Sequence, residues 1–239
     1  MRGHSLLERL REAPTETALV FDVDGTLAPI VPRPEDAAVP EATREELVRL
    51  AGRYLLVACL SGREREDAWS VVGVDGIELV GNHGLELDAR TNEFREALAR
   101  FRDDVGGRVE DKGLSLSYHY RDASDPAAAR AELELVAERA RRAGFVTRWG
   151  RRVLEIRPPV DADKGTALRE LLRLSGARRG LYAGDDTTDL DGFRGLAEAG
   201  LDVAVRVAVA SDEGPAELQE AADLVVDGPQ ELADLLGQL

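Results

Sequence analysis

The chain has 239 residues, and 44% of them are hydrophobic, which is enough for one large domain or for a core with a smaller insert. The formal charge of -15 disfavours nucleic acid or an anionic membrane surface as a partner. The sequence shows no signal peptide and no apolar run of the roughly 18 residues needed to span a bilayer. The single cysteine, Cys59, fits a reducing compartment because it can form no intramolecular disulfide. We therefore expect a cytoplasmic protein, and a monomer.

Up to residue 87 the sequence predicts short buried strands that alternate with helices. The strands are continuous apolar runs, which are typical of a parallel sheet covered on both faces. Thr43 and Glu46 have the spacing of a capping box and predict the start of a helix. In chain order the elements are a helix within 1–17, a strand at 18–21, a proline-rich loop at 28–39, a helix from Thr43, a strand at 54–60, a helix that ends near 72 and a strand at 77–80.

The pattern changes in the segment 88–160. A strand at 114–120 alternates leucine or tyrosine with serine or histidine, which indicates a sheet with one solvated face. Helices and strands then follow one another twice: a helix at 92–104, the strand at 114–120, a helix at 126–143 and strands at 145–149 and 153–157. This segment is therefore predicted to be a small α+β unit.

From residue 161 the alternation of helices and buried strands resumes. The elements are helices at 164–174, 189–199 and 215–222, a closing helix that runs to Leu239, and strands at 181–183, 203–210 and 224–226. We predict an α/β fold with a doubly wound, Rossmann-like parallel-sheet core formed by 1–87 and 161–239, into which an α+β cap domain at 88–160 is inserted.

Aspartate residues follow the ends of two of the predicted core strands. Asp22 and Asp24 follow the strand at 18–21, and they share a side because neighbours along a strand point to opposite faces. Asp185 and Asp186 follow the strand at 181–183 in the same way. Carboxylates held this close need a cation or a proton between them, and carboxylate and carbonyl oxygens suit Mg²⁺. The alternative for either segment is an ordinary Asp-rich turn.

Other strand and helix ends carry groups that suit an anion. Ser61 and the amide of Gly62 follow a strand and precede a helix, where an oxyanion can be held. Only two of the 31 basic residues are lysine, Lys112 and Lys164, and each precedes a glycine. Lys164 opens a helix, where its charge opposes the helix dipole, and a bound phosphate would explain that position. The alternative is that both lysines are accidental remnants of a composition that prefers arginine.

These elements resemble the four motifs of the haloacid dehalogenase superfamily of phosphotransferases. The motifs are residues 22–26 (DVDGT), Ser61, Lys164 and residues 184–186 (GDD), in the expected order. Within that superfamily the chain is similar to the trehalose-6-phosphate phosphatases over nearly its whole length. The similar segments are 81–84 (GNHG), 110–112 (EDK), 119–121 (HYR), 155–158 (EIRP) and 184–189 (GDDTTD). One departure is Leu190, where that family usually has Glu.

The resemblance implies an Mg²⁺-dependent phosphatase that acts through an aspartyl-phosphate and, since no synthase-like segment is attached, stands alone. It assigns Asp22 as the nucleophile and Asp24 as the general acid and base. The remaining residues implied are Asp22, the carbonyl of Asp24 and Asp185 for the metal, Ser61, Gly62 and Lys164 for phosphate, Asp186 and Asp189 behind the metal ligands, Arg63 and His83 near the substrate, and Glu110, Lys112 and Glu155 for the disaccharide.

Several alternatives remain at this stage. The substrate can be another sugar phosphate, such as a sucrose or mannosylglycerate phosphate, because only the cap distinguishes these. Glu110, Lys112 and Glu155 can be a surface ion-pair group, and His83 a structural turn histidine. A phospho-acceptor switch domain also clusters carboxylates beside a lysine, but it lacks an inserted cap and an acid two residues after the nucleophile.

Overall fold

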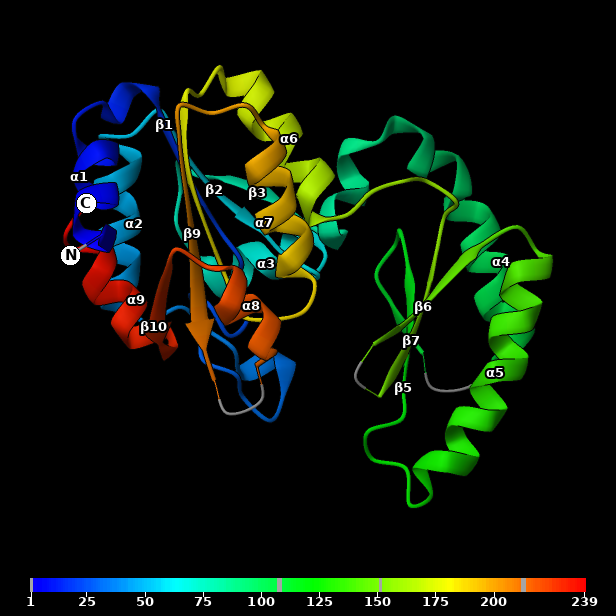
Figure 1. Ribbon diagram of the computed structural model, residues 1–239. Helices are drawn as coiled ribbons and strands as arrows, with labels where there is room; N and C mark the ends of the chain where they lie inside the picture. Colours follow the sequence, from blue (N-terminus) through cyan, green and yellow to red (C-terminus); the bar gives the residue numbers. More distant parts are fainter. Residues whose placement is uncertain (1, 107–108, 151, 212–213) are drawn as a thin grey trace. The chain divides into compact units, whose positions relative to one another are not determined.

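The computed structural model describes residues 2–106, 109–150, 152–211 and 214–239 (Figure 1). The chain divides into two compact units. The core unit comprises Met1–Gly84 and Ala162–Leu239, and the cap unit comprises Leu85–Asp161. None of the helices in the described ranges is both long and apolar enough to cross a membrane.

The core unit is built on a six-stranded parallel sheet with the strand order β10-β9-β8-β1-β2-β3. Its strands are β1 (Thr17–Phe21), β2 (Leu56–Leu60), β3 (Glu78–Val80), β8 (Arg179–Gly184), β9 (Val203–Ala210) and β10 (Leu224–Asp227). Every residue of β1 is fully buried, as the continuous apolar run predicts for a central strand covered on both faces. The predicted doubly wound parallel core is confirmed.

Helices cover both faces of this sheet. Leu19 and Phe21 of β1 pack into a cluster with α1 (Arg2–Arg11), α2 (Glu41–Ala51), α3 (Arg65–Val72) and α9 (Gly228–Leu236). Ala18 and Val20 pack on the other side, with α6 (Lys164–Ser175), α7 (Asp189–Glu198) and α8 (Ala216–Ala221). The alternation of side chains along one strand therefore feeds two separate hydrophobic cores.

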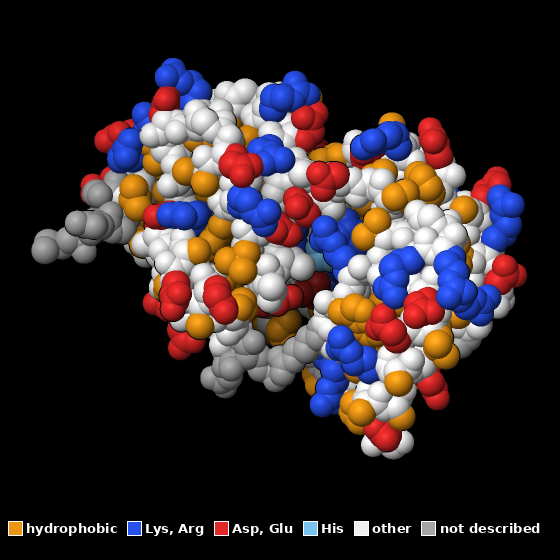
Figure 2. Space-filling model, turned by 45° about the vertical axis from the view of Figure 1, so that its right-hand side comes forward, with side chains coloured by type: hydrophobic (Ala, Val, Ile, Leu, Met, Phe, Trp, Pro, Cys, Tyr) orange, Lys and Arg blue, Asp and Glu red, His pale blue; other side chains and the backbone are white. Residues whose placement is uncertain are grey.

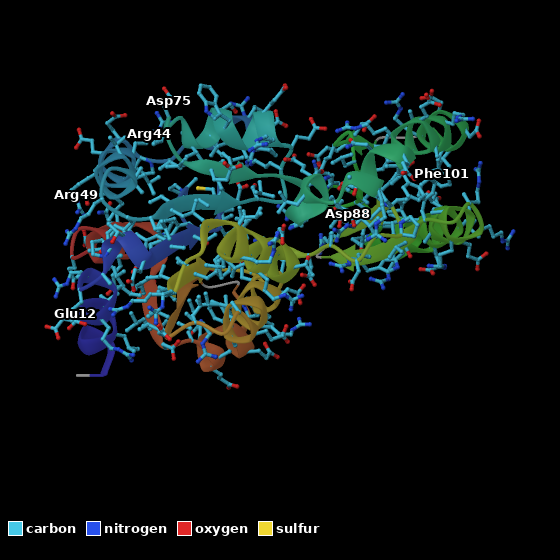
Figure 3. The ribbon with its side chains drawn as sticks, turned by 90° about the horizontal axis from the view of Figure 1, so that it is seen from above. Glu12, Arg44, Arg49, Asp75, Asp88 and Phe101 are labelled. Atoms are coloured by element: carbon cyan, nitrogen blue, oxygen red, sulfur yellow. The ribbon has the colours of Figure 1, made fainter. Side chains whose placement is uncertain are left out.

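Side chains also tie the outer helices together. Arg49 of α2, labelled in Figure 3, donates to the main-chain carbonyl of Leu236 in α9 over 2.9 Å. Basic and acidic side chains are interspersed on the face shown in Figure 2, and exposed pairs such as Arg178 with Asp202 (2.7 Å) are frequent. Pairs of this kind contribute little to stability, so the two apolar clusters carry most of it.

Strand register places the candidate residues at one edge of the sheet. Phe21 of β1 lies opposite Cys59 of β2 and Ala183 of β8, so these three strands end at the same level. Asp22, Ser61 and Asp185 come one or two residues after these paired positions. The carboxyl ends of three adjacent strands thus converge, as expected for a ligand site in a parallel sheet.

The cap unit is an antiparallel sheet with helices on one face. Its strand order is β4-β5-β7-β6, formed by β4 (Glu110–Asp111), β5 (Leu116–His119), β7 (Val153–Arg157) and β6 (Val146–Gly150). Leu116, Leu154 and Ile156 pack with α4 (Arg95–Val105) and α5 (Pro126–Arg142) in a third cluster. Phe101 of α4, labelled in Figure 3, packs edge-to-face on Phe145 with ring centroids 5.6 Å apart. The predicted α+β insert is confirmed.

Two local predictions are wrong. Helix α2 begins at Glu41 after Pro40, and Thr43 lies buried inside it without capping its end, because proline already sets the backbone for a helix start. The predicted helix at 92–104 begins only at Arg95, since Ala89–Phe94 forms a 3₁₀ helix capped by Asp88. The short strand β4 was not predicted.

Candidate active site

Asp22 stands where β1 ends, and its side chain is 7% exposed. Its main-chain amide continues the sheet by donating to the carbonyl of Ala183 over 2.9 Å. One carboxylate oxygen, Oδ1, lies 2.7 Å from the Lys164 ammonium. Burial raises the pKa of the Asp22 carboxyl well above its usual range, and the Lys164 charge opposes that rise only in part. The site thus holds an acid in a position where its charge is costly.

Lys164 is the first residue of α6 and is 3% exposed. Its ammonium lies 2.7 Å from Asp22 Oδ1 and 2.7 Å from Asp189 Oδ1. Burial alone would lower the pKa of this ammonium, but the carboxylates of Asp189 and Asp22 more than offset burial and raise it. The two carboxylates therefore offset the unfavourable interaction between the Lys164 charge and the dipole of α6 that its position at the helix start predicted.

The capping box of this chain lies at the start of α6 and fixes the backbone there. Asp163 Oδ1 accepts from the Thr166 amide (2.8 Å), and the Asp163 amide donates to Thr166 Oγ1 (2.9 Å). Two reciprocal bonds satisfy amides that a helix end otherwise leaves open. Lys164 is thus attached to a rigid first turn.

Asp185 follows β8 and faces the loop after β1. The Thr26 hydroxyl donates to Asp185 Oδ1 over 3.1 Å. Gly25 has a φ of +88°, and a Cβ at this position would lie 2.1 Å from Asp185 Oδ2, so only glycine fits. Burial, together with the charge of Asp189, raises the pKa of Asp185 to about 7.

Asp189 is fully buried and accepts four hydrogen bonds. Its Oδ2 accepts from the amides of Asp185 (3.0 Å) and Asp186 (2.9 Å). Its Oδ1 accepts from Lys164 Nζ (2.7 Å) and from the Tyr182 hydroxyl (2.6 Å). Sequence reasoning missed Tyr182, although a hydroxyl inside an apolar strand run is itself a signal, because a buried tyrosine hydroxyl needs a partner.

The three carboxylates of Asp22, Asp185 and Asp189 offer oxygens that lie within 4.8 Å of one another. Lys164 is the cation that the structure shows among them, so one ammonium faces three buried acids. Such a donor set fits a hard divalent cation with oxygen ligands. Since Asp189 already accepts four hydrogen bonds, Asp22 and Asp185 are the side chains with oxygens left for a metal. Asp186 is exposed, and its carboxylate lies outside this cluster.

The Asp24 carboxylate is not part of this cluster and pairs with Arg63 instead. Arg63 holds it through two bonds, Nε to Oδ2 and Nη2 to Oδ1, both 2.7 Å long. The Arg63 guanidinium also donates to the carbonyl of Pro34 over 3.1 Å, and its amide donates to Ser61 Oγ. The resemblance placed Arg63 near the substrate, and the structure places it on the predicted acid and base.

Ser61, Gly62 and His83 lie together at the end of β2. Ser61 is fully buried, its amide donates to the carbonyl of Val80 (2.9 Å), and its carbonyl accepts from the His83 amide (2.8 Å). A Cβ on Gly62 would lie 2.6 Å from the His83 ring, so the ring packs directly on Gly62. Asn82 and His83 both have a φ of +52°, which is uncommon for residues other than glycine. This strained turn holds His83 beside the predicted phosphate site.

The cap residues form part of one cross-strand row. Glu110 of β4 pairs with Ser117 of β5, which pairs with Glu155 of β7, so the two glutamates share a face of the cap sheet. Glu110 Oε2 lies 2.7 Å from His119 Nε2 and 3.8 Å from Lys112 Nζ. The structure thus brings the predicted sugar-binding residues of the cap onto one face.

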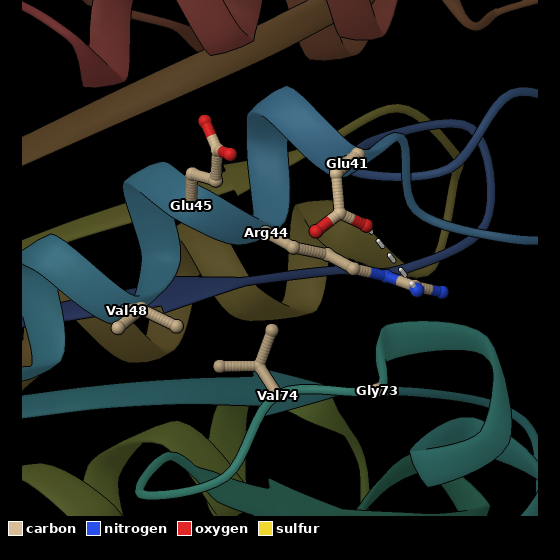
Figure 4. A pocket seen from close by; sticks show the side chains of 6 residues that line it. All are labelled: Glu41, Arg44, Glu45, Val48, Gly73 and Val74. Atoms are coloured by element: carbon tan, nitrogen blue, oxygen red, sulfur yellow. Dashed lines mark ion pairs between the residues drawn. The ribbon is translucent and has the colours of Figure 1, made fainter.

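The surface of the core unit also has a hollow. It measures about 330 Å³ and lies between α2 and the segment after α3 (Figure 4). Glu41 and Arg44 form a loose ion pair of 3.9 Å within it. None of the catalytic candidates lines this hollow, so it is not the candidate site.

Comparison with known proteins identifies the family. The trehalose-phosphatase family model matches residues 20–104 and 93–229. The chain belongs to the trehalose-phosphatase family. It is 34% identical over 245 residues to a trehalose-phosphate phosphatase of Mycobacterium marinum and 36% identical over 251 residues to one of Mycolicibacterium paratuberculosis. Each alignment covers 93% of this chain and 61% of the relative, so this trehalose-phosphatase family member spans less than two thirds of their length.

Solved structures show the same fold. The C-terminal domain of the Candida albicans trehalose-6-phosphate phosphatase superposes with a TM-score of 0.73 at 21% sequence identity, covering 99% of this chain and 96% of that one. The resemblance drawn from the sequence motifs is therefore confirmed, and so is the α/β core with its inserted cap.

Proposed function

We propose that this chain is a phosphoric monoester hydrolase that converts trehalose 6-phosphate to trehalose and phosphate through an aspartyl-phosphate. The observation that carries the proposal is the buried Asp22 carboxylate, held at 2.7 Å by Lys164 and flanked by Asp185 at the carboxyl edge of a parallel sheet. Family membership and the names of the relatives support the choice of reaction.

Asp22 is the proposed nucleophile. Lys164 holds Oδ1, and Oδ2 is the oxygen proposed to attack phosphorus while the bond from phosphorus to the sugar oxygen breaks. Lys164, the Ser61 hydroxyl and the Gly62 amide are the groups proposed to hold the phosphate oxygens. Asp22 and Asp185, with the carbonyl of Asp24, would hold Mg²⁺, which when bound reduces the repulsion between the carboxylate and the phosphate.

Asp24 is the proposed proton carrier in both steps. It gives a proton to the leaving sugar oxygen, and it then takes a proton from the water that attacks the aspartyl-phosphate. Arg63 binds both oxygens of the Asp24 carboxylate at 2.7 Å and so turns the carboxylate toward the guanidinium, although the leaving oxygen and the attacking water need it turned toward them. Arg63 is therefore proposed to release Asp24 when a substrate is bound.

The cap is proposed to select the sugar. Sugar hydroxyls need donors and acceptors; the Lys112 ammonium supplies donors, and the Glu110 and Glu155 carboxylates supply acceptors. Their placement on one face of the cap sheet supports a shared role. If these residues only form a surface ion-pair group, another sugar phosphate becomes the better candidate.

The test is phosphate release from trehalose 6-phosphate, sucrose 6-phosphate, mannosylglycerate phosphate and p-nitrophenyl phosphate, with Mg²⁺ and with EDTA. We expect trehalose 6-phosphate to give the highest kcat/KM, and EDTA to abolish release. A stable phosphoprotein without turnover would instead indicate a switch domain. Equal rates on all the sugar phosphates would contradict the proposed substrate.

Variants of the cap separate binding of the sugar from the chemistry. Lys112→Ala and Glu155→Ala should each lower kcat/KM for trehalose 6-phosphate by roughly tenfold or more, the scale of a lost charged hydrogen bond, and leave p-nitrophenyl phosphate nearly unchanged. Glu134→Ala, which breaks an exposed ion pair with Arg141 on α5, is the matched control and should change neither. Equal losses on both substrates would show that Lys112 and Glu155 support the cap itself.

A further inference from the structure

We propose that Tyr182 is a positioning residue for the proposed phosphatase reaction, and that its hydroxyl holds Asp189 so that Lys164 stays on the nucleophile. The inference rests on the proposed function and extends it to a residue behind the reacting groups. Tyr182 is the fourth residue of β8, in the middle of the sheet. It touches neither Asp22 nor Asp185 through any hydrogen bond that the described part of the chain shows.

The ring of Tyr182 is held firmly in place. Tyr182 is fully buried, and the ring packs edge-to-face on Phe193 of α7 with centroids 6.2 Å apart. A Cβ at Gly192 would lie 2.3 Å from the Tyr182 ring, so the helix backbone rests directly on it. Because strand and helix enclose the ring, the hydroxyl has one direction, and that direction is toward Asp189.

Asp189, held by the Tyr182 hydroxyl, in turn holds Lys164 and the turn at Asp185. Through Oδ1 it holds the Lys164 ammonium, which also reaches Asp22. Through Oδ2 it holds the amides of Asp185 and Asp186, and so fixes the turn that carries the proposed metal ligand Asp185. One carboxylate thus sets the position of both a phosphate-binding cation and a metal-binding loop.

The Tyr182 hydroxyl shares the Asp189 Oδ1 atom with Lys164. The two donors approach at 2.6 Å and 2.7 Å. Without the hydroxyl, Lys164 would be the sole donor to that oxygen among the described residues, and the Asp189 Oδ1 charge would no longer be shared between two donors. We expect the ammonium to move toward Asp189 and away from Asp22, because Coulomb attraction in a buried site is strong. Asp189 would also gain freedom to rotate, which loosens the Asp185 turn.

A purely structural role makes a different prediction. In that case the hydroxyl only satisfies a buried carboxylate, and its loss lowers stability with no change in kcat or in Mg²⁺ affinity. Tyr54 provides the matched control, because its hydroxyl donates to the main-chain carbonyl of Leu239 over 3.1 Å and it is likewise buried. Tyr182→Phe and Tyr54→Phe remove the same atom and one hydrogen bond each.

The experiment measures three quantities for both variants and the wild type. Urea unfolding gives stability, steady-state hydrolysis of p-nitrophenyl phosphate and trehalose 6-phosphate gives kcat and KM, and titration calorimetry with MgCl₂ alone gives metal affinity. We expect both variants to lose stability, Tyr182→Phe the more, because its partner is a carboxylate. Only Tyr182→Phe should lower kcat, by on the order of tenfold on both substrates with KM nearly unchanged, since a tenfold loss corresponds to about 1.4 kcal/mol in the barrier. It should also weaken Mg²⁺ binding severalfold.

Wild-type kcat and Mg²⁺ affinity in Tyr182→Phe would overturn the proposal and leave Tyr182 as a core residue. A fall in kcat that Tyr54→Phe shows equally would overturn it too, because general loosening would then explain the effect. If the wild type hydrolyses neither ester, the proposed function is wrong, and the Mg²⁺ titrations of the two variants still decide whether Tyr182 positions the carboxylates.

Discussion

Replacing Asp185 by asparagine should make the metal-free protein more stable. Asp185 is 9% exposed, and burial with the nearby charge of Asp189 raises its pKa from the ordinary 3.8 to about 7. The shift is about 3 pH units, and at 1.36 kcal/mol per unit the ionised carboxylate costs the folded state at most about 4 kcal/mol near pH 7. Asparagine removes this charge, and its side-chain oxygen can still accept from Thr26 Oγ1. We expect Asp185→Asn to gain about 2 to 4 kcal/mol at pH 7 in EDTA.

The sign of the pH dependence follows from the raised pKa. Between about pH 4 and pH 7 the folded wild type binds a proton at Asp185 that the unfolded chain has released, so this contribution to stability falls as pH rises. The difference between Asp185→Asn and the wild type should therefore grow from pH 4 to pH 7. Added Mg²⁺ should stabilise the wild type by mass action and the variant much less.

Urea unfolding followed by circular dichroism, in EDTA and at a series of pH values, measures this difference. Asp223 is the control of opposite sign, because hydrogen bonds from Arg206 lower its pKa in spite of partial burial. Asp223→Asn should destabilise the protein at pH 7. If Asp185→Asn is less stable than the wild type at pH 7 in EDTA, the carboxylate is not under electrostatic strain, and the argument for a cation between Asp22 and Asp185 fails.

Four further predictions follow from the same geometry. Asp22→Asn should abolish phosphate release while circular dichroism shows an intact fold, because an amide keeps the shape but is a poor nucleophile; retained turnover would exclude Asp22. Lys164→Met should lower the free energy of unfolding by about 3 to 5 kcal/mol, because it strands buried carboxylates. Arg173→Met in the same helix breaks an exposed pair and should cost less than about 1 kcal/mol, and equal losses would contradict the buried-charge argument. Gly25→Ala should destabilise the fold by about 1 to 3 kcal/mol and remove Mg²⁺ binding in calorimetry, because φ is positive and a Cβ meets Asp185; normal binding would show that the loop can move. Cys59 should resist a thiol reagent in the native protein and react fully in denaturant, since it is buried and burial raises its pKa; rapid native labelling would indicate that β2 opens.

The strands that end in acid could be predicted because their signals are local. Apolar runs such as 18–21 stop at Asp22, and parallel strands put their carboxyl ends at one edge, so the meeting of Asp22 with Asp185 needed no knowledge of packing. The assignment of Lys164 to that edge also followed from its place at a helix start. The family resemblance supplied the roles.

The contacts that could not be predicted join residues that lie far apart in the sequence and meet only because of the fold. Arg63 and Asp24 are 39 positions apart, and which cation faces a given carboxylate depends on rotamers and backbone turns that no pattern encodes. Tyr182 looks like any residue of a buried strand until α7 brings Asp189 over it. Thr43 is a case in which a local pattern misled the prediction. Its capping-box spacing predicted a helix start, but Pro40 sets the start at Glu41, two residues before Thr43.

The tight turn at Gly84 has a consequence for how the molecule can change. A Cβ at Gly84 would lie 2.5 Å from the Cβ of Ala167 and 3.1 Å from the carbonyl oxygen of Asp163, so the chain leaves the core unit beside the place where it returns at Ala162. The core sheet can therefore form whatever lies between these two points. An insert of different length changes the entropic cost of joining them only slightly. The core sheet can therefore accommodate inserts of different length or sequence at this point while the edge that carries Asp22 and Asp185 keeps its structure.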